Sequence, residues 1–192
     1  MAIPTDTLYG LAGDPFNAVA VQRVFAIKGR TADRALPLIA SDAAQVSAHL
    51  GALPPAALPL ARSFWPGPLT LLMRASDRLA PEVSGGTGCV GVRVPACEVA
   101  RRLCDVCERP LTATSANLSG RPATDDPDEV ARSLGLAGGE VEGTPGVDLL
   151  LDAGKTPGGP PSTIVDITMG EPRLVRAGAI SWEAVLACLR RA

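Results

Sequence analysis

The amino-acid sequence predicts a single α/β domain built on a twisted, mixed sheet. Segments with helical periodicity alternate with short apolar segments typical of strands, which is the pattern of α/β proteins. Several strand-like segments also follow one another without an intervening helix, so both parallel and antiparallel pairs are expected. Neither an internal repeat nor an interdomain linker interrupts this order, and residues 1–192 are therefore expected to form one domain.

Capping residues mark six expected helices. Asn, Ser and Asp side chains can accept hydrogen bonds from the free N–H groups at a helix start, and a proline in the first turn loses no hydrogen bond. The prolines of Trp65-Pro66-Gly67-Pro68 end the third helix, because proline cannot continue a helix. The expected helices follow Asn17 (to Gly29), Ser41 (to about Leu50), Pro55 (to Phe64), Cys97 (to Cys107), Asp126-Pro127 and Ser181.

Apolar runs mark the expected strands. Residues 69–75 are almost entirely apolar, which indicates a buried strand, and residues 90–95 alternate, which indicates a half-buried one. Arg93 lies on the face opposite its valine neighbours, where a charged side chain usually meets solvent. The other expected strands are residues 110–114, 147–152, 162–168 and 173–176.

Composition excludes several classes of protein. A formal net charge of −2 argues against a broad surface for nucleic acid, and no apolar run is long enough to span a membrane. Five cysteines, an odd number, do not suggest a secreted disulfide scaffold, so a cytoplasmic protein is expected. Cys104 and Cys107 have helical spacing and are interpreted as core residues, with no metal site, and His49 as a surface residue.

Two segments resemble nucleotide-binding motifs and are rejected. Residues 86–91 match G-x-G-x-x-G, but they lead into a strand, whereas the dinucleotide motif must follow a strand and open a helix. Residues 154–156 resemble the end of a phosphate-binding loop, but the leading glycine is replaced by Leu149 and the prolines of residues 157–161 prevent a helix.

Besides the polar segment 4–10, five polar sites lie at the ends of expected core elements: residues 28–30, Arg93, and residues 112–117, 161–163 and 176–178. Each has a structural explanation, such as helix capping, compensation of a helix dipole or a polar turn. Together they favour a ligand site, because α/β folds bind ligands at the ends of their strands.

The same clusters carry a resemblance that covers nearly the whole chain. The sequence resembles the YrdC-like threonylcarbamoyl-AMP synthases in seven motifs that occur in family order. They are PTDTLYGL at 4–11, KGR at 28–30, FWPGPLT at 64–70, VGVRVP at 90–95, TSANLSG at 114–120, PSTIVD at 161–166 and VRAGAI at 175–180. The resemblance implies one YrdC-like domain over residues 1–192, with helices flanking the mixed sheet and a concave basic cleft.

It also implies an L-threonylcarbamoyladenylate synthase activity. Such enzymes convert L-threonine, bicarbonate and ATP, the last with Mg, to threonylcarbamoyl-AMP and pyrophosphate. A tRNA threonylcarbamoyl-transferase machinery then uses the product on adenosine 37 of tRNA. No protein ligand for Mg is expected. The reaction needs positioning and charge neutralisation rather than a covalent nucleophile, and this chain offers no Cys/His or Ser/His pair.

The resemblance assigns roles residue by residue. Arg93 is expected to take the threonine carboxylate, and Ala113 to touch threonine through its backbone. The expected threonine site comprises Thr7, Tyr9, Arg93, Ala113 and Ser162. The expected ATP site comprises Lys28, Arg30, Cys89, Ser115, Asn117 and Arg176. Catalysis is expected to depend on Lys28, Arg30, Ser115 and Asn117.

The chain departs from the family pattern in three places. Cys89 stands where many members carry a threonine, so a contact with ATP there is either absent or made by the backbone. One extra residue precedes Ser41, where members usually have a histidine, which leaves a threonine contact at Ser41 open. Only residues 1–3 precede the first motif, so an unpaired sheet edge is expected, and no further C-terminal domain is expected.

Two other functions compete with the synthase. A double-stranded RNA or tRNA-binding module could use Lys28, Arg30, Arg34 and Arg121 in the same cleft, but the acidic composition and few aromatics oppose it. A carbamoyl-transferring relative of hydrogenase-maturation proteins is opposed by the lack of zinc-finger cysteines.

Overall fold

A six-stranded mixed sheet forms the centre of the computed structural model, which describes residues 1–136, 140–141 and 143–191. The strand order is β11–β10–β4–β5–β3–β6, in which β10–β4 and β5–β3 are parallel and the other neighbours are antiparallel. The predicted mixed sheet is therefore confirmed. Its strands are β3 (Leu38–Ile39), β4 (Leu69–Arg74), β5 (Cys89–Arg93), β6 (Leu111–Thr112), β10 (Thr163–Asp166) and β11 (Arg173–Arg176).

A smaller antiparallel sheet joins the N-terminus to the middle of the chain, in the order β1 (Ala2–Ile3), β2 (Gly10–Leu11) and β7 (Thr114–Ser115). The chain leaves the large sheet after β6 and enters this one at β7. The prediction of one strand over residues 110–114 is therefore wrong. At the break, the Ala113 N–H donates to the Pro37 carbonyl. A separate hairpin pairs β8 (Glu140–Val141) with β9 (Thr144–Pro145).

The N-terminal strand is paired on both sides. β2 lies along one side of it, and on the other the Ala2 N–H donates to the Leu149 carbonyl and the Leu151 N–H to the Ala2 carbonyl. The expectation of an unpaired edge is therefore wrong. Residues 147–152 also do not form the predicted strand, because only isolated bridges, at Val147 and Leu150, involve this segment.

The six predicted helices are confirmed, with one cap displaced. The Asn17, Asp126 and Ser181 side chains cap α1, α5 and α6 as expected. The cap of α2 is Asp42 rather than Ser41, because the Asp42 carboxylate accepts a 2.7 Å hydrogen bond from the Gln45 N–H. The helices are α1 (Ala18–Ile27), α2 (Ala43–Leu50), α3 (Ala57–Phe64), α4 (Glu98–Val106), α5 (Pro127–Leu134) and α6 (Trp182–Leu189).

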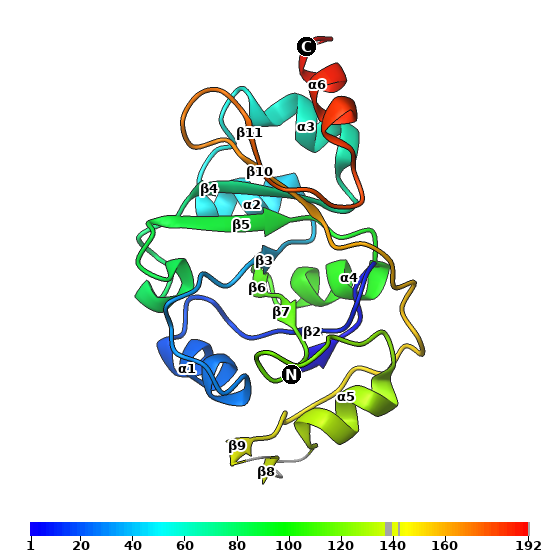
Figure 1. Ribbon diagram of the computed structural model, residues 1–192. Helices are drawn as coiled ribbons and strands as arrows, with labels where there is room; N and C mark the ends of the chain where they lie inside the picture. The colour runs from blue at the N-terminus through cyan, green and yellow to red at the C-terminus, as the bar shows by residue number, and fades with distance from the viewer. Residues whose placement is uncertain (137–139, 142, 192) are drawn as a thin grey trace.

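The chain runs back and forth along the molecule, so each end combines early and late elements (Figure 1). Helices α3 and α6 pack together at one end, beyond β10 and β11, and α1 and α5 lie at the other end. Aliphatic residues dominate the core, which includes a small cluster around α4 that contains Cys104. Cys104 is thus a buried core residue, as predicted, whereas His49 is half-buried beside the Phe16 ring. In the described part of the chain, no helix combines the length and the apolar character needed to cross a membrane.

Candidate active site

A cavity of about 580 Å³ opens between the large sheet and the small one. Its walls come from the segment before β2, from β3, β4 and β5, and from the segments around β7, β10 and β11. The structure thus brings together residues from distant motifs, such as Thr5 and Arg176, which lie 171 positions apart in the sequence. The predicted site residues that line the cavity are Thr7, Tyr9, Arg93, Ala113, Ser115, Ser162 and Arg176.

The first wall is a tight turn organised by Thr5. The buried Thr5 hydroxyl donates to the Leu8 carbonyl at 2.7 Å and accepts from the Thr7 N–H at 3.1 Å. Behind the turn, the Thr156 hydroxyl and the Gly158 N–H both donate to the Thr7 carbonyl. These bonds fix the polar segment as a loop against residues 156–158 rather than as a strand.

Tyr9 lines the cavity, but its hydroxyl is engaged elsewhere. The hydroxyl donates to the Gly154 carbonyl at 2.8 Å and accepts from the Ala153 N–H at 3.2 Å. Burial raises the pKa of Tyr9 above its ordinary value. The ring is completely enclosed, so Tyr9 anchors the first wall to the loop that carries residues 153–154.

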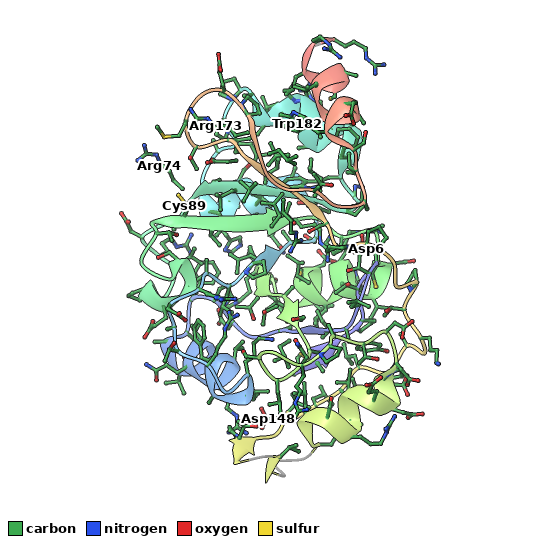
Figure 2. The ribbon with its side chains drawn as sticks, in the orientation of Figure 1. Asp6, Arg74, Cys89, Asp148, Arg173 and Trp182 are labelled. Carbon is green, nitrogen blue, oxygen red and sulfur yellow. The ribbon has the colours of Figure 1, made fainter. Side chains whose placement is uncertain are left out.

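Arg93 is buried rather than solvated, which corrects the usual expectation for a charged residue in an alternating strand. It lies at the end of β5 on the cavity face, with Nη1 3.1 Å from a carboxylate oxygen of Asp6. Figure 2 labels Asp6 near the tip of the β5 arrow. Desolvation lowers the pKa of Arg93, and the Asp6 charge opposes this effect. The guanidinium nevertheless remains charged at neutral pH.

Ser162 and Arg176 form the opposite wall together with Thr70. The Ser162 and Thr70 hydroxyls are 2.8 Å apart, and both side chains are buried. Arg176 donates from Nη2 to the Ser162 carbonyl at 2.8 Å and to its hydroxyl at 3.1 Å. Thr70 was missed as a site residue, although a hydroxyl inside the apolar run of residues 69–73 could have indicated it.

Lys28 lies behind the cavity and holds the loop after β7. Its ammonium donates to the Ser115 carbonyl at 2.6 Å, to the Asn117 carbonyl at 3.0 Å and to Asn117 Oδ1 at 3.1 Å. An ammonium has three donors, and these contacts use all of them. Desolvation, and secondarily the charge of Arg30, lowers the pKa of Lys28 to about 8. Lys28 is only 3% exposed, and the Asn117 Oδ1 atom to which it donates also accepts a hydrogen bond from the Ser115 hydroxyl.

Arg30, Asn117 and Cys89 are not among the described residues that line the cavity. The Arg30 guanidinium lies 5.3 Å from the Phe25 ring centre. Cys89 is on the cavity face of β5, two residues before Gly91, and Figure 2 labels it at the opposite end of β5 from Asp6. Ser41 is also not among the described residues that line the cavity, and its N–H donates to Gln45 Oε1 on α2.

Among the described residues that line the cavity, the charged ones are Arg93 and Arg176, so two cationic side chains face it. The concave basic cleft that the resemblance implies is a wider feature and stays a prediction. No group of three or more His, Cys, Asp and Glu side chains suited to a metal ion occurs in the described residues. The arrangement can hold a small zwitterion beside Arg93 and an anionic ligand towards Ser115 and Arg176.

Comparison with known proteins identifies the family. The family model described as "Sua5_yciO_yrdC: Telomere recombination" matches residues 1–178. The chain belongs to the Sua5/YciO/YrdC family. This membership accounts for the order in which the seven motifs occur along the chain.

Similar Sua5/YciO/YrdC proteins include synthases. The chain is 37% identical over 185 residues to a threonylcarbamoyl-AMP synthase of Pyrococcus abyssi. The aligned residues cover 96% of this chain and 52% of the relative. It is 36% identical over 171 residues to a synthase of the same name from Thiobacillus denitrificans, with 89% and 86% covered. The crystal structure of P. abyssi Sua5 complexed with L-threonine superposes with a TM-score of 0.86 at 35% identity, and 97% of this chain and 52% of that chain are covered. The chain thus spans about half the length of the P. abyssi relative.

Proposed function

We propose that the chain acts as an L-threonylcarbamoyladenylate synthase, which forms threonylcarbamoyl-AMP and pyrophosphate from L-threonine, bicarbonate and ATP. The observation that carries this proposal is the single cavity that unites Thr7, Arg93 and Ser162 with Ser115 and Arg176. The synthase names of the similar proteins and the threonine complex of P. abyssi Sua5 support it.

In the proposed reaction, Arg93 holds the threonine carboxylate, and Thr7, Ser162 and the Ala113 backbone surround the rest of the amino acid. The threonine amine adds to the carbon of carbon dioxide derived from bicarbonate, which gives a carbamate and releases a proton. A carbamate oxygen then attacks the α-phosphate of ATP, and the bond to the β,γ-pyrophosphate breaks. The protein contributes alignment and charge neutralisation.

The nucleotide is assigned to the loop after β7 and to Arg176. Ser115, Asn117 and Arg176 would hold the nucleotide, Arg30 would neutralise its phosphates, and Cys89 would contribute at most its backbone. Because the Lys28 ammonium is saturated by loop oxygens, we assign it the positioning of Ser115 and Asn117. Magnesium enters with ATP as part of that substrate. A cytoplasmic tRNA threonylcarbamoyl-transferase machinery would consume the product.

A pyrophosphate-release assay tests the proposal. The purified chain should release pyrophosphate only when L-threonine, bicarbonate and Mg-ATP are all present, and Arg30→Ala should reduce the rate at least about tenfold. Asp14→Asn, which alters an ion pair with Arg109 away from the cavity, should leave the rate unchanged. Release that does not depend on threonine would refute the proposal. Salt-dependent binding of double-stranded RNA without affinity for ATP would favour the RNA-binding alternative.

A further inference from the structure

The carboxylate of Asp6 is enclosed without a hydrogen-bond donor. Its side chain is 10% exposed, and both oxygens are covered and lack a hydrogen-bond partner. Its one described contact is the 3.1 Å ion pair with Arg93 Nη1, which does not have hydrogen-bond geometry. Buried polar groups in folded proteins nearly always have a hydrogen-bond partner. The two oxygens of this carboxylate are therefore free to accept hydrogen bonds from a ligand.

The fold determines where this carboxylate lies. Asp6 is the central residue of the turn that the Thr5 hydroxyl closes through its bonds to the Thr7 N–H and the Leu8 carbonyl. The residues on either side of Asp6, Thr5 and Thr7, both line the cavity. Thr156 and Gly158 hold the turn from behind. Asp6 is thus fixed at the edge of the cavity, next to the end of β5.

Asp6 lies beside Arg93, the residue that is assigned to the substrate carboxylate. An α-amino acid carries its ammonium and its carboxylate on the same carbon atom. If the substrate carboxylate binds Arg93, the substrate ammonium must lie within a few ångströms of the Asp6 carboxylate, which already faces Arg93. No Asp or Glu occurs among the described residues that line the cavity, and Asp6 is the acid paired with one of those residues, Arg93.

We propose that Asp6 binds the α-ammonium group of the amino-acid substrate. Asp6 neutralises Arg93 when the cavity is empty. On binding, the substrate carboxylate takes its place on Arg93, the Asp6 side chain rotates away, and its oxygens accept hydrogen bonds from the ammonium. One ion pair within the protein is exchanged for two with the ligand. The proposal deepens the proposed function and rests on threonine as the substrate.

The consequence is a specificity for amino acids over simple carboxylic acids. A ligand without the amine must still displace Asp6 from Arg93, and it then leaves that carboxylate buried and unpaired. (R)-3-Hydroxybutyrate is L-threonine without its amine, so it isolates this effect. We expect the protein to bind L-threonine about tenfold to a hundredfold more tightly than (R)-3-hydroxybutyrate. The free energy that a hydrogen bond to a charged group contributes corresponds to an affinity ratio in this range.

The test is calorimetric titration of both compounds into the wild type, Asp6→Asn and the matched control Asp14→Asn. Asp14 pairs with Arg109 at 2.7 Å and does not line the cavity, so the control should keep the wild-type preference. In Asp6→Asn the preference should fall to about threefold or less, because threonine binding weakens while hydroxybutyrate binding stays the same or tightens. Retained ATP binding would show that the variant is folded.

The possible outcomes separate the proposal from its alternatives. If Asp6→Asn weakens the binding of both compounds equally, Asp6 only holds Arg93 in place. If it strengthens the binding of both equally, Asp6 only competes with them for Arg93. Either result would show that the proposal is wrong. If the wild type binds both compounds equally, amine recognition is refuted without any variant, even should Asp6→Asn fail to fold. If the wild type binds neither, the assignment of threonine in the proposed function fails together with this one.

Discussion

Lys28 provides a prediction that can be worked out in detail. It is one of two lysines in the chain, and burial lowers its pKa to about 8 from the ordinary 10.5. Below pH 8 the ammonium is charged in both the native and the unfolded state, so the full cost of burying it is present. Between pH 8 and 10.5 the native state has lost the proton while the unfolded state retains it. Stability contributed by this residue therefore rises with pH in that window.

The expected rise follows from the two pKa values. A difference between about 8 and 10.5 corresponds to roughly 3 kcal/mol of unfolding free energy, since one pH unit is worth about 1.4 kcal/mol. Lys28→Met removes the titrating group and also leaves the Ser115 and Asn117 oxygens without their donor, which costs about 1–3 kcal/mol per group at any pH. Only the pH-dependent part of the difference between the proteins isolates the lysine charge.

Denaturant unfolding of both proteins from pH 7 to 10.5 measures this part. The stability of the wild type relative to Lys28→Met should increase by roughly 3 kcal/mol across the range. Lys155→Met is the control, because Lys155 is exposed and the pKa of its ammonium is raised by Asp126, so its removal should give no such increase. A constant difference between wild type and Lys28→Met would refute the reasoning. So would a lysine NMR signal for Lys28 that titrates at 10.5 or above.

Three further predictions follow from the contacts of the site and core. Thr70→Val removes the hydroxyl that lies 2.8 Å from Ser162 Oγ. It should weaken threonine binding by about 1 kcal/mol without changing ATP binding, as measured by calorimetry. Equal losses of affinity for threonine and ATP would contradict this prediction. Gly178→Ala would place a Cβ in steric overlap with the Pro161 carbonyl oxygen and should destabilise the fold by about 1–3 kcal/mol, which would lower the Tm. An unchanged Tm would show that this close approach is not maintained. Burial raises the pKa of Cys104 to about 12, so iodoacetamide at pH 8 should leave this thiol unmodified in the native protein; labelling as fast as in denaturant, by peptide mass spectrometry, would be the opposite result.

Local features of the sequence predicted much of the fold. The caps at Asn17, Asp126 and Ser181 were identified correctly because a cap depends on residues within one helical turn. The cap of α2 was displaced by one residue because Ser41 and Asp42 are both favourable cap types, and only the bond to the Gln45 N–H distinguishes them. The strand expected over residues 147–152 failed since its neighbours, Ala2 among them, are distant in sequence.

In the candidate site too, features carried by a local motif could be predicted, whereas contacts between residues distant in the sequence could not. Of the eleven site residues that the resemblance assigned, seven line the cavity. The resemblance did not identify the pairing of Arg93 with Asp6, which joins residues 87 positions apart, and a solvated arginine was the ordinary expectation. It also did not show that Lys28 donates to the carbonyl oxygens of Ser115 and Asn117, because backbone acceptors carry no sequence signal.

Direct identification of the product tests the central claim that this cavity couples threonine, bicarbonate and ATP. The chain would be incubated with isotope-labelled bicarbonate, L-threonine and Mg-ATP, and the nucleotides analysed by mass spectrometry. We predict one adenylate that contains both the labelled carbon and the threonine, formed in a one-to-one ratio with pyrophosphate. Formation of ADP and phosphate, or of pyrophosphate without this adenylate, would contradict the proposed function.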